Sequence, residues 1–242
     1  MFNYKNKVCQ DIAKDDDMYL GNKDHYLGVG ESAIKNIIAS LELANKEECL
    51  SILDMPSGYG RVLRYLKAEF PNAHITACEL NRKAVDYCVS TFGVNGLYSD
   101  KDLKKIQMKN KFDLIWCGSL FTHLDQDLWP MFLDFFFNQL EEKGVLVFTT
   151  HGRYVAQRIF NKTCDYGISK EKLSVIFDGY NNNGFGYFNY INNEDYGISL
   201  SSFSWILNEI SKIKGFRVVL FSEKGWDNHQ DVIACIKETN SI

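Results

Sequence analysis

One stretch decides the fold of this chain: Ser51-Ile52-Leu53-Asp54-Met55-Pro56-Ser57-Gly58-Tyr59-Gly60-Arg61-Val62-Leu63. A short apolar run ends at the acid Asp54, passes through a turn that contains glycine, and enters a pattern with helical spacing. This order predicts a strand, a ligand-binding turn and a helix. Glycine lets a ligand approach the backbone, and the start of a helix points free N–H groups at that ligand.

A second acid follows at the distance that a nucleotide-binding fold requires. About 19 residues after Gly60, the apolar run His74–Cys78 ends in Glu79. In a strand–helix–strand unit, an acid at the tip of the second strand binds the hydroxyl groups of a ribose. The two strands with their acids therefore predict a ligand that contains a nucleoside.

The turn resembles motif I of the class I S-adenosylmethionine (SAM) methyltransferases, Asp/Glu-x-Gly-x-Gly-x-Gly. Asp54 occupies the acid position, and Pro56 replaces the first glycine. The resemblance implies SAM as cofactor, with Glu79 on the ribose, Leu80 over the adenine, and an acid after the third strand at the adenine amino group. The cofactor-binding residues expected on this basis are Asp54, Pro56, Ser57, Gly58, Gly60, Glu79, Leu80, Ser99, Asp100, Cys117 and Gly118.

An NAD-dependent oxidoreductase with a Rossmann domain would carry a similar turn. Its fingerprint, Gly-x-Gly-x-x-Gly, places the third glycine at Leu63, where a side chain keeps the helix away from the strand and hinders a pyrophosphate. SAM has no phosphate, so this position does not weigh against a methyltransferase. The sequence also allows a SAM-binding module without catalytic groups, or an ordinary strand–helix turn that binds no ligand.

The remaining sequence predicts an α/β fold. Apolar runs and helical patterns alternate between residues 50 and 150, which indicates a parallel sheet with helices on both faces. The last two runs are joined by so few residues that they form an antiparallel hairpin. This arrangement resembles the Rossmann-like, seven-stranded class I methyltransferase sheet, which is mostly parallel with an antiparallel seventh strand. The predicted strands are 50–54, 74–78, 96–99, 112–117, 145–150, 216–222 and 231–237, and the predicted helices are 31–46, 60–69, 81–92, 128–140, 154–160, 170–177 and 201–213.

The N-terminal residues 1–30 are predicted to form a lid segment before a SAM-binding methyltransferase domain at 31–242. In many relatives a segment before the first strand folds over SAM, and Tyr19, His25 and Tyr26 are the candidate substrate contacts in this one. Such a lid excludes water from the transfer. The alternative is that these aromatic residues only pack the first helix against the domain.

Residues 151–200 break the alternation of strands and helices. The stretch from Asp178 to Tyr190 is rich in glycine, asparagine and aromatic residues. A solvated loop is one interpretation. The many aromatic side chains favour the other, a substrate cap over the ligand face.

The loop after strand 216–222 contains the first candidates for catalysis. Its sequence Gly-Trp-Asp-Asn-His-Gln-Asp resembles a segment of a bacterial subgroup of class I methyltransferases that is linked to glycans and small metabolites. A hydroxyl acceptor needs a base, and a histidine paired with a carboxylate has a suitable pKa. We therefore predict His229 as the base, paired with Asp227 or Asp231, and Trp226 as a substrate contact; a polar hairpin turn is the alternative.

The loops after strands 112–117 and 145–150 contain two further histidines. His123 lies in Phe-Thr-His-Leu, which resembles a segment of many small-molecule methyltransferases. It is the second candidate base, and a packing histidine is the alternative. His151 is a predicted substrate contact. The Asn/Asp-Pro-Pro-Tyr motif of enzymes that methylate DNA or protein nitrogens does not occur at this position, which argues against those acceptors.

Composition narrows the function further. A net charge of −4 and a pI near 5.8 argue against nucleic acid as a partner. No run approaches 18 uninterrupted apolar residues, so no membrane span is predicted. Seven scattered cysteines without a Cys-x-x-Cys pair indicate reduced thiols in the cytoplasm. Possible metal ligands are spread over three loops, so no metal is expected, and the sequence carries no signal of the oligomeric state.

Taken together, these observations predict a cytoplasmic SAM-dependent methyltransferase. Its expected acceptor is a small molecule or a sugar, methylated at oxygen rather than nitrogen or carbon. Methyl transfer from a sulfonium is an in-line displacement, so most of the rate is expected from positioning.

Overall fold

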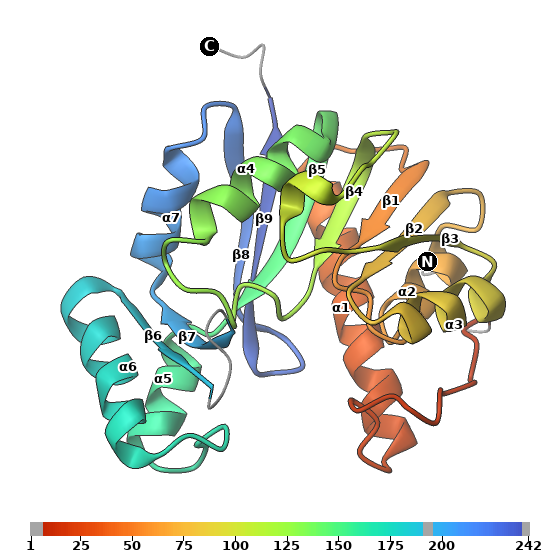
Figure 1. The fold of residues 1–242 in the computed structure, drawn as a ribbon. Helices are drawn as coiled ribbons and strands as arrows, with labels where there is room; N and C mark the ends of the chain where they lie inside the picture. The colour runs from red at the N-terminus through yellow and green to blue at the C-terminus, as the bar shows by residue number, and fades with distance from the viewer. Residues whose placement is uncertain (1–6, 191–195, 239–242) are drawn as a thin grey trace.

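The central sheet has the predicted arrangement. The computed structural model describes residues 7–190 and 196–238, and its seven-stranded sheet has the order β3-β2-β1-β4-β5-β9-β8 (Figure 1). The first five strands pair in parallel, whereas β9 is antiparallel to both neighbours, so β8 points the same way as β5. The Rossmann-like sheet with one antiparallel strand is thus confirmed. Its strands are β1 (Ser51–Asp54), β2 (His74–Glu79), β3 (Asn95–Tyr98), β4 (Phe112–Cys117), β5 (Leu140–Thr150), β8 (Phe216–Trp226) and β9 (Gln230–Lys237).

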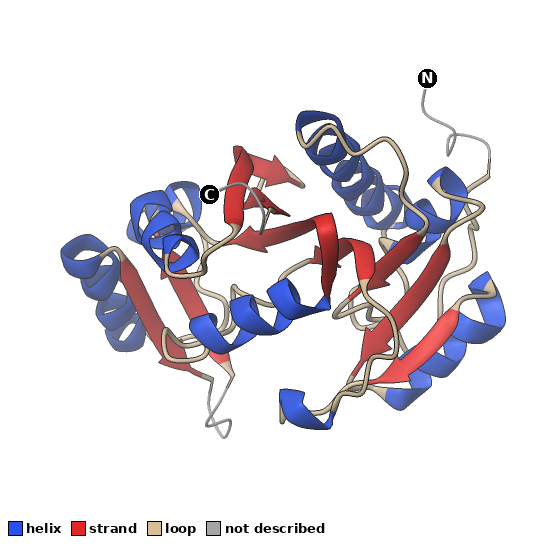
Figure 2. Cartoon of the chain, turned by 90° about the horizontal axis from the view of Figure 1, so that it is seen from above, coloured by secondary structure: helices blue, strands red, loops and turns tan. Residues whose placement is uncertain are grey.

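Helices cover both faces of the sheet, as Figure 2 shows from above. Strand residues alternate between two buried cores: Leu114 and Trp116 of β4 belong to one, and Ile115 and Cys117 to the other. Burial on both faces explains why the strands read as continuous apolar runs. The first core includes α1 (Lys23–Leu43), α2 (Leu63–Glu69) and α3 (Arg82–Phe92), and the second includes η2 (Leu103–Lys105), α4 (Trp129–Gln139) and α7 (Phe203–Ser211).

The first helix begins earlier than its apolar pattern indicates. Asn22 caps α1, and its side-chain oxygen accepts the N–H of His25 at 3.0 Å. The predicted start of this helix at residue 31 is therefore wrong. The polar residues after Asn22 do not show the apolar spacing of a helix, although they form its first turns. The end of α3 agrees with its prediction, since Gly93 follows it with a φ of +64°.

A separate unit lies between β5 and α7, beyond one end of the sheet (Figure 1). It consists of α5 (Arg153–Phe160), α6 (Lys170–Asn183) and the antiparallel pair β6 (Phe185–Asn189) and β7 (Gly197–Ser201). Its buried side chains form their own core. We call this unit the cap. The segments 1–6 of the predicted lid and 191–195 of the predicted cap lie outside the described residues.

The helix α6 extends further than predicted. Gly179 and the three following asparagines read as a loop, yet α6 continues to Asn183 and ends before Gly184. A Cβ at Gly179 would lie 2.8 Å from the carbonyl oxygen of Phe185. The glycine is therefore needed where α6 packs on β6, and does not mark a loop.

The cap is attached at the carboxyl edge of the sheet. The N–H of Ser199 in β7 donates to the carbonyl of Thr122, and the N–H of Ser201 donates to that of His151, both at 2.9 Å. Ligands of parallel sheets bind at this edge. In the described part of the chain, none of the helices has both the length and the apolarity to cross a membrane.

Candidate active site

The turn after β1 is built around Glu79. Gly58 has a φ of +50°, which glycine adopts easily, and its N–H donates to Oε2 of Glu79 at 3.1 Å. Oε1 of the same carboxylate accepts the N–H of Leu80 at 2.7 Å and that of Asn81 at 3.1 Å. A carboxylate offers about four acceptor sites. Three backbone donors therefore fix its orientation and leave capacity for a ligand hydroxyl.

Asp54 is a buried carboxylate with one oxygen free. It ends β1 and is 1% exposed, and among the described residues nothing bonds to its Oδ2. Burial, with a contribution from the nearby Glu79, raises the pKa of Asp54 well above its usual value. Because an unpaired buried carboxylate is costly, this position suits a cationic group of a ligand.

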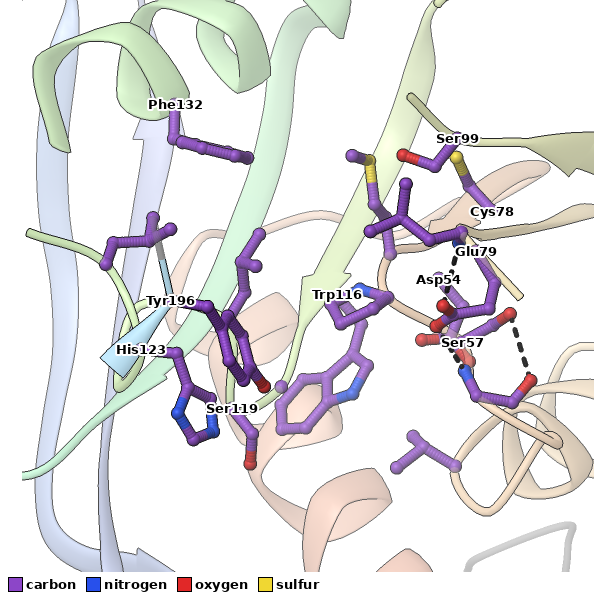
Figure 3. Close-up of a pocket in the computed structure, with 18 of the residues that line it drawn as sticks. Asp54, Ser57, Cys78, Glu79, Ser99, Trp116, Ser119, His123, Phe132 and Tyr196 are labelled. Atoms are coloured by element: carbon purple, nitrogen blue, oxygen red, sulfur yellow. Dashed lines mark hydrogen bonds between the residues drawn. The ribbon is translucent and has the colours of Figure 1, made fainter. Parts of the chain in front are cut away.

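A cavity of about 890 Å³ begins at these two acids and extends to the base of the cap. This volume lies near the upper end of the range of about 300–1,000 Å³ for ligand pockets. We call the region of Asp54, Ser57, Glu79 and Ser99 the acid end, and that of His123, His151, His229, Tyr166 and Tyr196 the imidazole end. Figure 3 shows Trp116 between the acids on one side and His123 with Tyr196 on the other.

Most predicted site residues line this cavity. They are Asp54, Pro56, Ser57, Gly58, Glu79, Leu80, Ser99, Asp100, Gly118, His123, His151, Trp226 and His229.

Two predicted cofactor contacts are absent from the lining. Gly60 has a φ of +80°, and a Cβ there would lie 2.5 Å from the ring of Phe92, so this glycine allows the turn to pack on α3. Cys117 is fully buried in the core beneath α4, because strand alternation turns it away from Trp116. Neither offers a side chain to a ligand in the cavity.

His229 lines the cavity, but without the predicted carboxylate partner. Its Nδ1 lies 3.4 Å from Nη1 of Arg158, and its Nε2 lies 2.8 Å from the hydroxyl of Tyr166. A guanidinium only donates, so Nδ1 accepts, and Nε2 carries the hydrogen that Tyr166 accepts. Burial and the charge of Arg158 both lower the pKa of His229, and the charge of Asp227 opposes them without reversing the direction.

The two acids predicted to pair with His229 face elsewhere. Asp227 has a left-handed backbone with a φ of +55°, and its Oδ2 lies 3.7 Å from Nε2 of His25 on α1. Asp231 is the second residue of β9, pairs with Thr150 of β5, and accepts the N–H of Lys224 at 2.9 Å. Neither lines the cavity. The predicted hydrogen-bonded pair is therefore not formed, because Asp227 of the β8–β9 turn lies beside His25 and Asp231 of β9 is held by the backbone of Lys224.

The N-terminal aromatic residues pack the first helix against the domain. Tyr26 is 1% exposed and its hydroxyl donates to Asp16 at 2.5 Å. Tyr19 packs edge-on against Tyr26 with ring centroids 5.8 Å apart, and His25 faces the β8–β9 turn. None of the three lines the cavity, whereas Met18 of the same segment does. The structure therefore supports the alternative, in which these aromatic residues pack the first helix against the domain, over the predicted substrate contacts.

At the imidazole end, β7 fixes His123. Nδ1 of His123 lies 2.7 Å from the carbonyl oxygen of Gly197, and its ring stacks on Tyr196 with centroids 4.5 Å apart. A carbonyl only accepts, so Nδ1 carries the hydrogen and Nε2 keeps its lone pair. Burial lowers the pKa of His123, with the bond to Gly197 opposing, so the ring is neutral at physiological pH.

A ring of hydrogen bonds that the sequence analysis missed joins three strand ends beside the cavity. The N–H of Ser119 donates to Oγ1 of Thr149 at 2.8 Å, and that hydroxyl donates to Oε1 of Gln230 at 2.6 Å. Nε2 of Gln230 donates back to Oγ of Ser119 at 2.8 Å. Ser119 and Gln230 line the cavity. Their position at the ends of β4 and β9 was the available signal, because polar side chains at the carboxyl edge of a parallel sheet lie where ligands bind.

Comparison with known proteins identifies the central domain. Residues 52–144, from β1 into β5, match the family model described as a methyltransferase domain. A malonyl-[acyl-carrier protein] O-methyltransferase of Acetivibrio thermocellus is 24% identical over 155 residues, which cover 64% of this chain and 53% of that protein. The alignment thus spans about half the length of that relative.

Solved structures share the fold. A SAM-dependent methyltransferase of Clostridium acetobutylicum superposes with a TM-score of 0.59 at 14% identity and covers 86% of this chain and 92% of its own. The SAM-bound amino pentose methyltransferase CalS10 of Micromonospora echinaspora gives a TM-score of 0.57 at 12% identity, with 86% and 91% covered. Residues 52–144 are thus similar to a methyltransferase domain, and the chain shares the fold of SAM-dependent methyltransferases.

Proposed function

We propose that this protein transfers a methyl group from SAM to an oxygen of a small-molecule or sugar acceptor. One observation carries the proposal: a continuous cavity joins the acids expected to hold the cofactor to a group of neutral imidazoles. Its volume leaves room for an acceptor of limited size beside the cofactor. The fold that the chain shares with an amino pentose methyltransferase is compatible with such an acceptor.

The acid end fits SAM. The free Oδ2 of Asp54 suits the cationic amino acid part of the cofactor, and Glu79 retains capacity for a ribose hydroxyl. Leu80 and Asp100 line the cavity where the adenine is expected. When bound, SAM would supply a methyl group attached to a positively charged sulfur. The acceptor oxygen would form the new C–O bond, and the sulfur would keep the electron pair of the broken C–S bond as a neutral thioether.

His123 is the base that the geometry favours. Its Nε2 lone pair faces no partner in the described chain, and the bond to Gly197 holds the tautomer in which that nitrogen can take the proton from the acceptor hydroxyl. Both ring nitrogens of His229 are already engaged by Arg158 and Tyr166. We therefore assign the proton transfer to His123 and a supporting role to His229.

The cellular compartment is part of the proposal. All seven cysteines are free, and four of them are buried. Reduced thiols of this kind are typical of cytoplasmic proteins, which supports a function on a cytoplasmic acceptor.

Two measurements test the proposed function. Calorimetry should detect SAM binding, and tritiated SAM should label a member of a panel of sugars, sugar nucleotides and other hydroxylated metabolites. Absence of SAM binding would remove the proposal altogether. Methyl transfer only to amines would remove the assignment to oxygen.

A further inference from the structure

His151 offers a hydrogen-bond acceptor that nothing in the described chain uses. Its side chain lines the cavity at the end of β5 and is 3% exposed, and Nδ1 has no partner among the described residues. The backbone of Ser199 in the cap bonds to the imidazole. Nδ1, without a partner, therefore remains for a ligand.

The ring is neutral. His229 lies 5.5 Å and Tyr166 5.1 Å from it between ring centroids. Burial lowers the pKa of His151 well below its usual value, and the neighbouring imidazoles of His229 and His123 lower it further. A buried acceptor that is left unsatisfied costs about 1–3 kcal/mol. A ligand that donates a hydrogen bond to Nδ1 is therefore favoured at this site.

The surrounding groups have a fixed polarity. Nε2 of His123 is a second acceptor, because Nδ1 donates to Gly197. Ser119 can donate, because its Oγ accepts from Gln230 and its own hydrogen remains. Figure 3 shows Ser119 beside His123, between that ring and Trp116. A matching ligand presents two polar hydrogens and one acceptor oxygen.

Fixed cations are absent from the described lining of this end. Two cations do line the cavity: Lys101 belongs to the loop after β3, and Arg61 lies over the ring of Trp226, 5.5 Å from its centroid. Arg158 contacts His229 from the cap but is not part of the lining. Residues 191–195, outside the described part, contain neither lysine nor arginine in their sequence. A carboxylate or phosphate would therefore meet lone pairs in place of positive charge.

We propose that His151 determines acceptor specificity: its Nδ1 accepts a hydrogen bond from a second hydroxyl of a neutral, polyhydroxylated acceptor, and the imidazole end rejects acceptors with a carboxylate at that position. This inference rests on the proposed function and names its substrate class. Proton transfer stays with His123, so His151 is a positioning residue.

The first test uses nitrogen NMR of the full chain labelled with ¹⁵N-histidine. The signal of Nδ1 of His151 should be that of an unprotonated, neutral ring throughout the neutral range. It should move when a neutral sugar or cyclitol of a screening panel is added with S-adenosylhomocysteine present, and stay in place with the matching uronic acid. A positively charged His151 at neutral pH, a response to the uronic acids alone, or no response to any neutral member overturns the proposal.

The second test uses two substitutions at His151. His151→Phe keeps an aromatic ring but has no acceptor, whereas His151→Asn places an amide oxygen near the position of Nδ1. We expect the Phe variant to raise KM for the responding acceptor about 10-fold, the loss of one hydrogen bond, with SAM affinity unchanged, and the Asn variant to restore most of it. Equal KM in wild type and the Phe variant refutes the role of His151. If the wild-type protein does not bind SAM, the proposed function itself is refuted.

Discussion

At the scale of single residues, Glu79 has two roles in the proposed function, because one carboxylate orders the turn after β1 and is proposed to bind the cofactor. Glu79→Ala removes both, and we expect SAM affinity to fall by about 1.5–3 kcal/mol, the range for hydrogen bonds to a charged group. Glu79→Gln keeps an acceptor for the backbone N–H groups and should lose less. Calorimetry of the two variants separates the charge from the turn. Unchanged affinity in Glu79→Ala would exclude the ribose contact.

His123 is the residue on which the rate should depend. His123→Ala should lower kcat by about 10²–10⁴-fold, the range for a lost general base, with little change in SAM affinity. Because only the neutral ring accepts a proton, the rate should rise with pH through a group with a pKa below the usual value of a histidine, and level off near neutrality. His229→Ala is the matched control and should lose less. A greater loss in His229→Ala would reverse the assignment.

The acids of the site could be predicted from the sequence, and the pairing of the histidines could not. Asp54 and Glu79 follow apolar runs directly, so their place at the carboxyl edge follows from strand order alone. The partners of His229 depend on φ angles in a tight turn and on Tyr166, 63 residues away in the cap. No local pattern encodes either of these.

At the scale of elements, Gly60 shows how a turn is tied to a helix. Its φ is +80°, and a methyl group there would meet Phe92 at the end of α3. Gly21 has nearly the same φ, +81°, but open space around it. Gly60→Ala should therefore destabilise the protein by about 1–3 kcal/mol more than Gly21→Ala, the usual cost of overpacking. Urea unfolding of the two variants without ligand measures the difference, and equal losses would show that only the backbone conformation matters.

Strands and helices of the sheet followed from periodicity, and so did α5 and the first part of α6, whereas the strands of the cap and the full length of α6 did not. The pair β6 and β7 has glycine at Gly186 and Gly197, where a Cβ would collide with backbone of α6 or of the paired strand. The close packing requires glycine here, although glycine and asparagine in a sequence usually indicate a loop. The length of α6 is therefore decided by what packs on it, and sequence propensity alone underestimates it.

At the scale of the whole molecule, buried histidines make stability depend on pH. An unfolded histidine titrates near 6.5, whereas His151 in the fold has a pKa well below that, through burial and the nearby His229. Below pH 6.5 the unfolded chain binds a proton that the folded chain does not. The free energy of unfolding should then fall with decreasing pH by about 1.4 kcal/mol per pH unit for this group.

His151→Phe isolates that contribution. Asp231, with a pKa raised to about 6 by burial, titrates in the same range with the opposite sign, but it is present in both proteins and cancels in the difference. Urea unfolding between pH 5.5 and 6.5 should give a shallower slope for the variant. Parallel curves would show that His151 is protonated in the folded state.

The separate core of the cap has an evolutionary consequence. Its side chains pack mainly on one another, and the chain enters and leaves it at neighbouring points, after β5 and before α7. Such a segment can diverge, or be exchanged for that of another enzyme, while the acids at the ends of β1 and β2 stay in place. Transplanting this one contiguous segment would then give the scaffold a new acceptor, while the strand ends proposed to bind SAM stay unchanged.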